Sequence, residues 1–487
     1  MIVMKFGGSS LESANAIERV ASIVRAQLAL RPVVVVSAMG KTTNGLIAAA
    51  EHAAQGHSYL AYRTLDDLRC FHVAETERLL RGQSKLFIAQ SITPKFRELH
   101  LWLSHLVEGD RRLTSQCKDE ILSYGERLSS EIVSAAFHRL GINSVHLDAR
   151  RVIQTDNQFG HATPLYWETY AKLRRALPYL GENTVAVLGG FIGATEEGVT
   201  TTLGRGGSDL TASIVGAGIC AEEIQIWTDV DGMLTCDPRI LDGGHRLRSI
   251  SYREAEDMAK LGAKVLHPST VAPAIRQRIP LTIRNTRRPD IEGTKIASAA
   301  SGANGTVKSI AGRPGMTIVH LDAHDASMLP TITEGLSSLL AHHNIAVELV
   351  QARPSGVSFA VETSPILPQL LRKVDPSVQV RVEEERAIVA LVGDGVGSTP
   401  AVTSRALLAL RNHVCMYGQG SSLCAVCFAV PEAELHPVVE KLHREFFSAP
   451  DPELFVAARA IPEAVSAAQP SRGHAALSIP TKTVPAH

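Results

Sequence analysis

The stretch that decides the fold is the beginning of the chain, Ile2–Ser10, which reads IVMKFGGSS. Five residues with the character of a buried strand are followed by two glycines, which indicate a turn. Apolar residues from Ile17 to Leu28 then recur at helical spacing, and the next apolar run, Pro32–Gly40, has the β-branched composition of a strand buried on both faces. A strand, a helix and a second buried strand in this order indicate an α/β fold.

The same alternation continues along the chain. Ser123–Gly141 is expected to be a helix, because apolar residues recur every four positions from Leu128 to Leu140 and a glycine follows as a stop. Further strands are expected at residues 184–190, 223–229 and 279–286. The sequence therefore predicts an open, mostly parallel sheet sandwiched by helices, and such sheets bind ligands at the carboxyl ends of their strands.

The character of the chain changes after about Ala297. Residues 298–306, SAASGANGT, are small and polar, as in a linker. Two similar blocks follow, at 316–362 and 387–447, each with the pattern strand, helix, strand, strand, so the chain contains an internal repeat. Beyond Pro470 the chain has no aromatic residue, and the tail is expected to be disordered.

Composition and charge exclude several classes of function. Of 487 residues, 49 are Lys or Arg and 49 are Asp or Glu, so the net charge is zero and no overall field would attract nucleic acid or an anionic membrane. No apolar run approaches the length of a membrane span, and the first residues lack the apolar region of a signal peptide. Seven scattered cysteines indicate reduced thiols and a cytoplasmic protein.

Cys424 and Cys427 have a spacing that could suggest a metal site. Their segment, SSLCAVCFAV, reads as a strand, on which residues three apart face opposite sides. No second cysteine pair has zinc spacing, and the 19 histidines form no HExxH pair. We therefore expect two core thiols and no metal bound by protein side chains alone.

The turn KFGGSS, Lys5–Ser10, has the features of a phosphate-binding turn. Glycines allow the backbone to approach an anion, and backbone N–H groups at the start of a helix attract phosphate. Lys5 could neutralise charge that moves between the β- and γ-phosphates of a nucleotide. Taken alone, an ordinary strand–helix turn explains this pattern equally well.

A second glycine turn, Leu203–Asp209, reads LGRGGSD. Its Arg205 offers a planar fork for a carboxylate or phosphate, and Asp209 could hold an ammonium group. Glu126, in YGERLSS, could be a second acceptor for that ammonium, so the three residues together fit an α-amino acid. The alternatives are a helix N-cap for Asp209 and a solvated helix carboxylate for Glu126.

A third turn, in IWTDVDGMLTCDPR, follows the strand expected at 223–229. Asp229 lies at the end of this strand, and Arg239 could reach a phosphate. An ordinary loop is the alternative.

Two other glycine motifs are weaker. GKT at Gly40–Thr42 resembles the end of a Walker A loop, but Val35 stands where that motif needs glycine. GDGVGS at Gly393–Ser398 resembles a dinucleotide fingerprint, but Ser398 replaces its third glycine. We expect an ordinary tight turn there.

Together, these segments resemble the aspartate kinases of the amino acid kinase family. The resemblance covers about residues 1–460 and is carried by VMKFGGSS, VVSAMGKTTNGL, SYGERLSSEI, GGFIGATEEGVTTTLGRGGSDLTAS, IWTDVDGMLTCDPR, EAEDMAKLGAKVLHPSTVAPA and IPLTIRNTRRPDIEGT. It implies transfer of the ATP γ-phosphate to the side-chain carboxylate of L-aspartate, with Mg²⁺ entering with ATP. The product, 4-phospho-L-aspartate, would open the synthesis of lysine, threonine and methionine, or of ectoine.

The resemblance also implies a set of site residues, matched by position. Lys5 and Asp209 correspond to catalytic residues, and Ser37, Thr43, Glu126, Arg205 and Ser208 to aspartate-binding residues. Lys5, Gly7, Gly8, Ser9, Thr228, Asp229, Arg239 and Lys264 correspond to ATP-binding residues. Ser9 stands where threonine is usual in the family, and Leu210 where tyrosine is common.

The two C-terminal blocks resemble paired ACT domains, which are α+β modules with a βαββαβ pattern. The resemblance implies that they are interleaved, with TVKSIAG adding a strand to the second unit. The expected parts are a catalytic domain at 1–297, a linker and joining strand at 298–315, ACT domains at 316–386 and 387–460, and a tail at 461–487.

ACT domains imply an amino-acid effector and a homodimer or larger assembly. Gln351, Ala352, Arg353 and Pro354 stand where the family often has small hydroxyls and an acid, so the effector stays open.

Two other functions remain as alternatives. The first is a kinase for another amino acid such as glutamate, because one methylene changes affinity little in an apolar pocket. The second is a non-catalytic amino-acid sensor built on the ACT pair.

Overall fold

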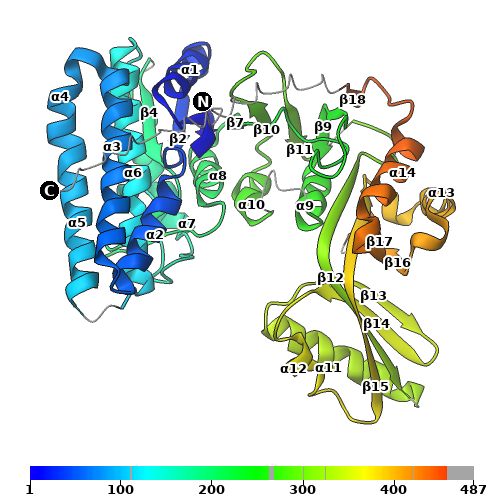
Figure 1. The fold of residues 1–487 in the computed structure, drawn as a ribbon. Helices are drawn as coiled ribbons and strands as arrows, with labels where there is room; N and C mark the ends of the chain where they lie inside the picture. Colours follow the sequence, from blue (N-terminus) through cyan, green and yellow to red (C-terminus); the bar gives the residue numbers. More distant parts are fainter. Residues whose placement is uncertain are drawn as a thin grey trace, which may run out of the picture.

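The computed structural model describes residues 1–109, 112–181, 183–262, 268–299, 301–323, 325–420 and 422–457. Figure 1 shows an N-terminal part, in which helices cover a sheet, and a C-terminal part built around two long strands. The expected tail at 461–487 lies outside the described residues. None of the helices in the described ranges is long and apolar enough to cross a membrane.

The N-terminal part contains an eight-stranded sheet in the order β3-β4-β2-β1-β7-β10-β11-β9 among the described residues. The first six of these strands are parallel, and β11 is antiparallel to β10. The predicted open, mostly parallel sheet is therefore confirmed. The bounds are β1 Ile2–Phe6, β2 Pro32–Val36, β3 Ser144–His146, β4 Val185–Gly189, β7 Glu223–Thr228, β9 Ser249–Ser251, β10 Leu281–Asn285 and β11 Thr294–Ala297.

Helices cover both faces of this sheet because the strands are apolar on both sides. Met4 and Phe6 of β1 pack in one core with helices α1–α6, whereas Val3 packs in the other core with α7 and α8. The alternation follows from the two-residue period of a strand. The helices are α1 Ala14–Arg25, α2 Thr42–Ala54, α3 Ser58–Leu80, α4 Ser84–Phe87, α5 Thr93–Glu108, α6 Ser115–Arg139, α7 Tyr166–Ala176, α8 Gly207–Ile219, α9 Tyr252–Lys260 and α10 Pro268–Arg276.

The carboxyl ends of the central strands meet at one edge of the sheet. In the parallel register, Phe6 at the end of β1 lies beside Val36 of β2 and Trp227 of β7. Thr228, the last residue of β7, lies beside Asn285, the last residue of β10. The loops that follow these four strands therefore start side by side, and this edge is where a parallel sheet binds its ligand.

The turn after β1 differs from the sequence-based expectation. Gly8–Ser10 forms one turn of 3-10 helix, and α1 begins only at Ala14, where the Ser13 side chain accepts a hydrogen bond from Ala16 N. The glycine pair therefore does not form the first turn of the long helix. The residues after β1 instead form a separate 3-10 turn, Gly8–Ser10, which has free N–H groups of its own.

The C-terminal part is built on two long strands, β12 Ser309–Ala323 and β15 Val378–Val392, which run through both α+β units (Figure 1). Ser309–Arg313 pairs with the second half of β15, and Met316–Ala323 pairs with the first half. Residues of TVKSIAG thus contribute to a strand in the second unit, and the first unit is inserted between β12 and β15. The second block was expected to begin with a strand at 387, whereas β15 starts nine residues earlier, at Val378.

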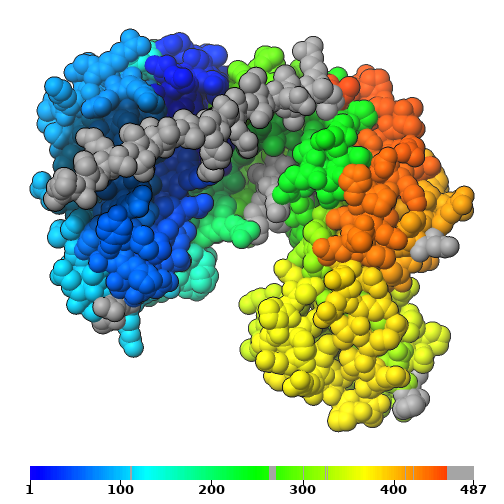
Figure 2. Space-filling view, viewed as in Figure 1, coloured from blue at the N-terminus to red at the C-terminus, as the bar shows by residue number. Residues whose placement is uncertain are grey.

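The six-stranded sheet of this part has the order β13-β14-β12-β15-β17-β16 among the described residues. In Figure 2 the first unit projects away from the rest of the molecule, whereas the second packs against the N-terminal part. The other elements are α11 Leu329–His342, β13 Val347–Arg353, β14 Gly356–Glu362, α12 Leu367–Leu371, α13 Pro400–Leu410, β16 Met416–Gln419, β17 Ala425–Pro431 and α14 Leu435–Phe447.

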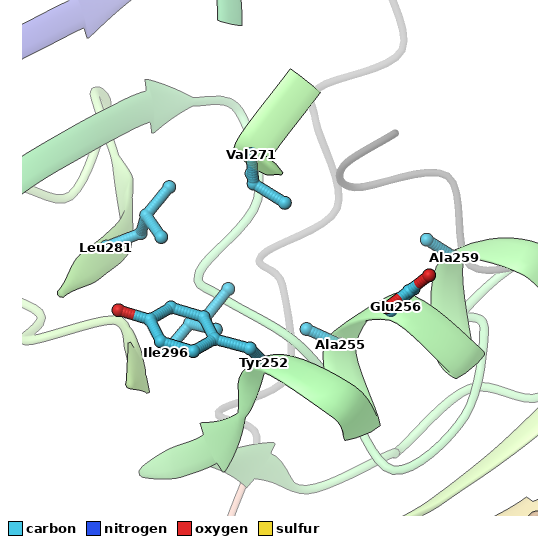
Figure 3. Close-up of a pocket in the computed structure, with 7 residues that line it drawn as sticks. All are labelled: Tyr252, Ala255, Glu256, Ala259, Val271, Leu281 and Ile296. Carbon is cyan, nitrogen blue, oxygen red and sulfur yellow. The ribbon is translucent and has the colours of Figure 1, made fainter. Parts of the chain in front are cut away.

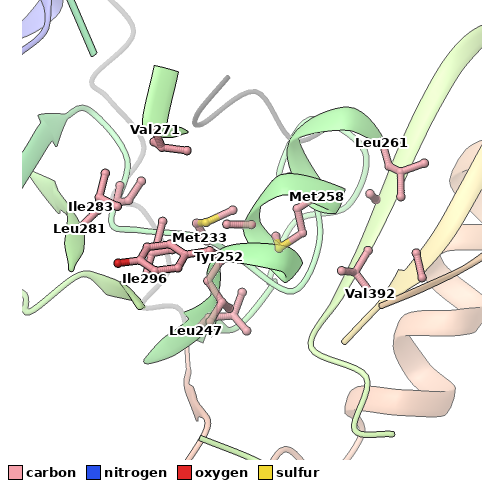
Figure 4. Packing of buried hydrophobic residues seen from close by; sticks show 14 of the residues in the cluster. Met233, Leu247, Tyr252, Met258, Leu261, Val271, Leu281, Ile283, Ile296 and Val392 are labelled. Carbon is pink, nitrogen blue, oxygen red and sulfur yellow. The ribbon is translucent and has the colours of Figure 1, made fainter. Parts of the chain in front are cut away.

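The second unit shares a hydrophobic core with the N-terminal part. Figure 4 shows Tyr252 and Met258 of α9 between the sheet residue Ile296 and Val392 of β15, and all four belong to one cluster. Ile310 N of β12 also donates to the carbonyl of Thr235, in the loop after β7, at 2.7 Å. This loop is therefore held by the C-terminal sheet.

The two closely spaced cysteines are part of the packing. Cys424 and Cys427 are both buried, the latter within β17, and burial raises the pKa of the Cys427 thiol. The prediction of two core thiols is confirmed. GDGVGS forms a tight turn in which Gly395 has φ +69°, as expected.

Candidate active site

A cleft of about 360 Å³ opens at the carboxyl ends of β1 and β2. It lies between the turn after β1, the loop after β2, helix α6 and the start of α8. Several residues singled out from the sequence line it, although they come from four separate segments. The lining residues are Lys5, Gly8, Ser37, Ala38, Gly40, Thr43, Asn44, Glu126, Phe191, Gly204, Gly206, Gly207, Ser208 and Asp209.

The cleft contains one closely paired lysine and aspartate. Lys5 Nζ lies 2.6 Å from Asp209 Oδ1, and the two side chains are 11% and 17% exposed. Asp209 lies in the first turn of α8, where the N-cap is Gly206 in the left-handed region, with φ 71°. The N-cap alternative for Asp209 is therefore wrong. Its carboxylate instead faces the lysine, and the helix start favours its negative charge.

Glu126 is the second acid in the cleft, and it is almost completely buried, at 3% exposure. Its Oε1 accepts a hydrogen bond from Ala38 N at 3.2 Å, whereas Oε2 has no partner among the described residues. Burial raises the pKa of Glu126 to about 8, although the Ala38 amide and the Lys5 charge oppose this shift. The alternative of a solvated helix carboxylate is wrong, and an unpaired buried oxygen needs a hydrogen-bond partner.

Ser208 is positioned by a glycine that the sequence analysis did not single out. Ser208 is buried in the first turn of α8, and a Cβ placed on Gly190 would lie 2.7 Å from its Cβ. On the opposite side of the cleft, a Cβ on Gly8 would lie 3.0 Å from the carbonyl oxygens of Ala38 and Gly40. Backbone therefore packs directly on backbone at both sides of the cleft.

The turn after β1 has both used and free N–H groups. Gly7 N donates to the Trp227 carbonyl at 3.2 Å, so it fastens the turn to β7 and is not free for a phosphate. Gly8 N and Ser9 N have no hydrogen-bond partner among the described residues. Gly8 and Ser9 therefore keep free N–H donors, and the expected place of Gly7 in an ATP-binding turn stays a prediction in which its N–H already has a partner.

Two substrate-side residues predicted from the sequence lie in the loop after β2 and the start of α2. Ser37 N donates to the Phe6 carbonyl at 3.0 Å, which fastens the start of this loop to β1. Ser37 also lines the cleft. Thr43 lies in the first turn of α2. Asn44, which the sequence analysis did not name, lines the cleft beside Thr43, and Phe191 lines it from the loop after β4. Neither residue type signals a site from sequence alone.

Arg205 lies in the loop between β6, Thr200–Thr202, and α8, and its side chain is exposed. The neighbouring Gly204 and Gly206 line the cleft, but Arg205 does not. It makes no hydrogen bond or ion pair with the residues that the structure describes. The guanidinium is thus available to an anion beside the cleft mouth.

Lys5 and Gly8 of the predicted nucleotide residues line this cleft, whereas Thr228, Asp229 and Arg239 do not. Thr228 is the last residue of β7 and Asp229 follows it, and the Thr228 hydroxyl donates to Asp229 Oδ1 at 3.1 Å. Arg239 pairs with Asp237 in its own loop and is 58% exposed. Lys264 lies outside the described residues. These loops share the strand-end edge with the cleft but do not line it.

A second cavity is much smaller than the cleft and has a mainly apolar lining. A void of about 10 Å³ lies among Tyr252, Val271, Leu281 and Ile296, and Figure 3 shows these mainly apolar side chains around it. It shares no lining residue with the cleft and is close to the size of one water molecule. This void is a packing defect of the core, not a candidate ligand site.

Comparison with known proteins agrees with this geometry. Residues 1–285 match the amino acid kinase family, and residues 389–446 match the ACT domain. A curated relative, lysine-sensitive aspartokinase 3 of Escherichia coli, is 33% identical over 92% of this chain and 99% of its own length.

Solved structures give the same result. Aspartokinase III of E. coli in complex with aspartate and ADP superposes with a TM-score of 0.78, at 31% identity over 92% of this chain and 100% of that chain. The same enzyme in complex with lysine and aspartate gives a TM-score of 0.76, also at 31% identity, over 92% of this chain and 99% of that chain. The family match covers more than half of the chain, and the identity of the full-length relatives extends across both parts of the fold. This chain belongs to the amino acid kinase family and, within it, to the aspartokinases.

Proposed function

We propose that this protein transfers the γ-phosphate of ATP to the side-chain carboxylate of L-aspartate and so forms 4-phospho-L-aspartate. The observation that carries the proposal is the Lys5–Asp209 pair in a cleft shared with the unpaired Glu126 oxygen. The cation Lys5 suits a polyphosphate, and the two acids Glu126 and Asp209 suit the ammonium group of an amino acid that binds beside it. The complexes of the E. coli relative with aspartate and ADP support the same assignment.

The acids of the cleft would bind the ammonium group of aspartate. Glu126 Oε2 lacks a donor, and Asp209 has only Lys5 as its charged partner among the described residues. The exposed Arg205 would take the α-carboxylate through its planar fork. Ser37, Thr43 and Ser208, whose positions border the cleft, would contribute hydroxyl contacts.

The reaction requires two anions to meet, and this determines what the residues must do. The side-chain carboxylate of aspartate is already ionised near pH 7, so it needs no general base. One of its oxygens attacks the γ-phosphorus, a new P–O bond forms, and the bond to the ADP oxygen breaks. Lys5 would offset the charge that moves onto the transferred group, and the free N–H groups of Gly8 and Ser9 would donate to phosphate oxygens.

The nucleotide would extend from this turn towards the loop after β7. Thr228, Asp229 and Arg239 are proposed contacts, supported by the loop that starts at the shared strand-end edge and by the family match. Lys264, which lies outside the described residues, is proposed on the family match alone. Among the described residues there is no group of three side chains suited to hold a metal. Mg²⁺ that enters with ATP would supply charge neutralisation at the phosphates.

The test is a hydroxamate assay. Purified protein with ATP, Mg²⁺, L-aspartate and hydroxylamine should form aspartyl hydroxamate, and L-glutamate in place of aspartate should form far less. More product with glutamate would favour the alternative amino acid kinase. Binding of aspartate without binding of ATP, measured by calorimetry, would favour a sensor and contradict the proposal.

We further propose that the ACT pair carries an amino-acid effector signal to the catalytic part. The support is the backbone bond from Ile310 to Thr235 and the buried ion pair between Lys308 of the joining segment and Glu254 of α9. An activity screen with lysine, threonine, methionine and ectoine-pathway metabolites would identify the effector.

We propose that the chain works in the cytoplasm as a homodimer or larger assembly. Its cysteines are free, and the sheet of the ACT pair ends in the edge strands β13 and β16. A light-scattering mass of 52.3 kDa at micromolar concentration would correspond to a monomer and contradict the assembly.

A further inference from the structure

Asp119 is a buried carboxylate near the active cleft. It lies in α6 and is 1% exposed. Its Oδ1 accepts a hydrogen bond from the Thr202 hydroxyl at 2.6 Å, and its Oδ2 accepts from Thr202 N and Gly160 N, both at 2.9 Å. It has no ion pair with any described residue. Three neutral donors therefore hold a carboxylate that neither lines the cleft nor pairs with a cation.

These donors belong to the two segments that flank the LGRGGSD turn. Thr202 is the last residue of β6, directly before Leu203. Gly160 packs on the turn from the other side, because a Cβ on Gly204 would lie 3.3 Å from the Gly160 carbonyl oxygen. Asp119 thus fixes both the strand that leads into the turn and the loop that covers it.

The same helix carries an acid of the cleft itself. Glu126 follows Asp119 by seven positions in α6, which is two helical turns, so the two side chains project from nearly the same face. Glu126 is fixed against Gly189, where a Cβ would lie 2.9 Å from the Glu126 Cβ. One rigid helix therefore holds Glu126 directly and the Arg205 turn through Asp119.

We propose that Asp119 is a positioning residue that sets the spacing between Glu126 and the Arg205 turn, and so sets the affinity and selectivity for the amino-acid substrate. The inference rests on the proposed function, because Glu126 and Arg205 are there the groups that bind the two ends of the amino acid. An α-amino acid has a fixed distance between its ammonium and its α-carboxylate. Loss of the Asp119 hydrogen bonds lets the Arg205 turn move and weakens binding of the ammonium and the α-carboxylate together. The turn after β1, which is proposed to bind ATP, is unaffected.

The decisive variants are Asp119→Ala and Asp119→Asn. Alanine leaves two buried N–H groups and a hydroxyl without their acceptor. Asparagine keeps all three contacts, because its oxygen accepts from both N–H groups and its NH₂ donates to the Thr202 hydroxyl. We expect Asp119→Ala to raise the KM for aspartate by about tenfold or more, the effect of one lost charge-assisted hydrogen bond, with the KM for ATP nearly unchanged. Asp119→Asn restores most of the aspartate affinity.

A matched control separates positioning from general loss of packing. Ser134 also lies buried in α6, but its hydroxyl contacts Ser144 of β3 and not the turn. Ser134→Ala should lower the melting temperature without changing the KM for aspartate. Should Asp119→Ala fail to fold, Thr202→Val removes only the hydroxyl bond and should raise the same KM by several-fold.

The outcomes are distinguishable from failure of the proposed function. If the wild-type protein forms no aspartyl hydroxamate, the proposed function is wrong. If the wild-type protein is active, an unchanged aspartate KM in folded Asp119→Ala and in Thr202→Val overturns the inference. Equal rises in the KM for ATP and for aspartate, or the same rise in Ser134→Ala, also overturn it.

Discussion

Lys5, near the end of the first strand, and Asp209, in the first turn of α8, form an ion pair with 2.6 Å between Nζ and Oδ1. The two residues are far apart in the sequence, and each adjoins a glycine-rich turn that was interpreted from the sequence as part of a ligand site. Their contact makes the two turns into the two walls of one cleft. A phosphate that reaches Lys5 and an ammonium that reaches Asp209 would therefore replace a contact that already exists within the protein.

Substitution of Lys5 should abolish phosphoryl transfer. We expect Lys5→Ala to lower the rate of aspartyl hydroxamate formation by on the order of 10³-fold or more, because charge on the transferred group is then not offset. Lys85→Ala, at an exposed position of α4, is the control. A Lys5→Ala rate within a few-fold of wild type would remove the lysine from the mechanism.

Aspartate binding should release a proton near neutral pH. Burial raises the pKa of Glu126 to about 8, so this carboxyl is protonated at pH 7 before substrate binds and must ionise to pair with the ammonium. Calorimetric titration in two buffers of different ionisation enthalpy should detect the proton, and affinity should rise with pH towards 8. Proton release that persists in Glu126→Gln would assign it to another group.

The same shift predicts the sign of a stability change. The pKa of Glu126 is raised from 4.5 to about 8 in the folded protein, so folding favours its protonated form. Its contribution to the free energy of unfolding is fully present below pH 4.5 and is lost as the pH rises through 8. Wild-type protein should lose more stability than Glu126→Gln over this interval in urea unfolding. Parallel pH profiles of the two proteins would contradict the assignment.

Substitution of Arg205 should affect binding without affecting folding. Its side chain is exposed and makes no hydrogen bond or ion pair with the described residues, so Arg205→Ala should leave the melting temperature nearly unchanged. Loss of a charge-assisted bond to the α-carboxylate should raise the KM for aspartate by roughly 10- to 100-fold. Arg19→Ala, at an exposed position of α1, is the control and should change neither quantity. A normal aspartate KM in Arg205→Ala would exclude the arginine from binding.

A methyl group at Gly190 should disturb the cleft. A Cβ there would lie 2.7 Å from the Ser208 Cβ, so Gly190→Ala must displace the first turn of α8, which carries Asp209. We expect loss of most activity together with a lower melting temperature. Gly335→Ala is the control, because its methyl group would enter open space within α11. Gly141→Ala is unsuitable as a control, because Gly141 has φ +78°, which strains any residue with a side chain. Equal activity of the Gly190 and Gly335 variants would contradict this packing argument.

The buried pair of Lys308 and Glu254 should stabilise the join between the two parts. Their atoms Nζ and Oε1 lie 2.9 Å apart at 4% and 0% exposure, and Glu254 also accepts from Asp394 N. Lys308→Ala should lower the free energy of unfolding by about 3–5 kcal/mol, because it leaves an unpaired buried charge. Lys260→Ala breaks an exposed pair with Glu256 and should cost less than about 1 kcal/mol. Similar losses in urea unfolding would show that the buried pair has no special role.

Much of the architecture could be predicted from local pattern. The runs Ile2–Phe6 and 32–36 are strands as expected, because burial on both faces favours apolar residues at nearly every position, and Lys5 is the one charged residue among them. The long strand β15 was only half predicted, because its first half carries the polar run VEEER and is partly exposed. The boundaries expected for the catalytic domain, the linker, the two ACT domains and the tail stay predictions.

The site was predicted less completely than the fold. Lys5 and Asp209 were named because charged residues beside glycine turns carry a chemical signal, and Glu126 was named as a possible second acceptor for the same ammonium group. Gly190 and Asp119 were missed, because one acts only through close packing and the other only through contacts to distant backbone. The use of the Gly7 N–H by Trp227 could not be predicted either, since it depends on which strand lies beside β1.

The sequence by itself determined which segments become strands, which turns carry glycine and charge, and which family the motifs resemble, because strand alternation and turn chemistry act between near neighbours. Only the tertiary structure decided that Lys5 meets Asp209, that Glu126 is buried with one oxygen unpaired, and that Arg205 stays exposed. The physical reason is that these relations depend on the order of strands in the sheet and on the burial that follows from it, and neither is contained in the pattern of any single segment.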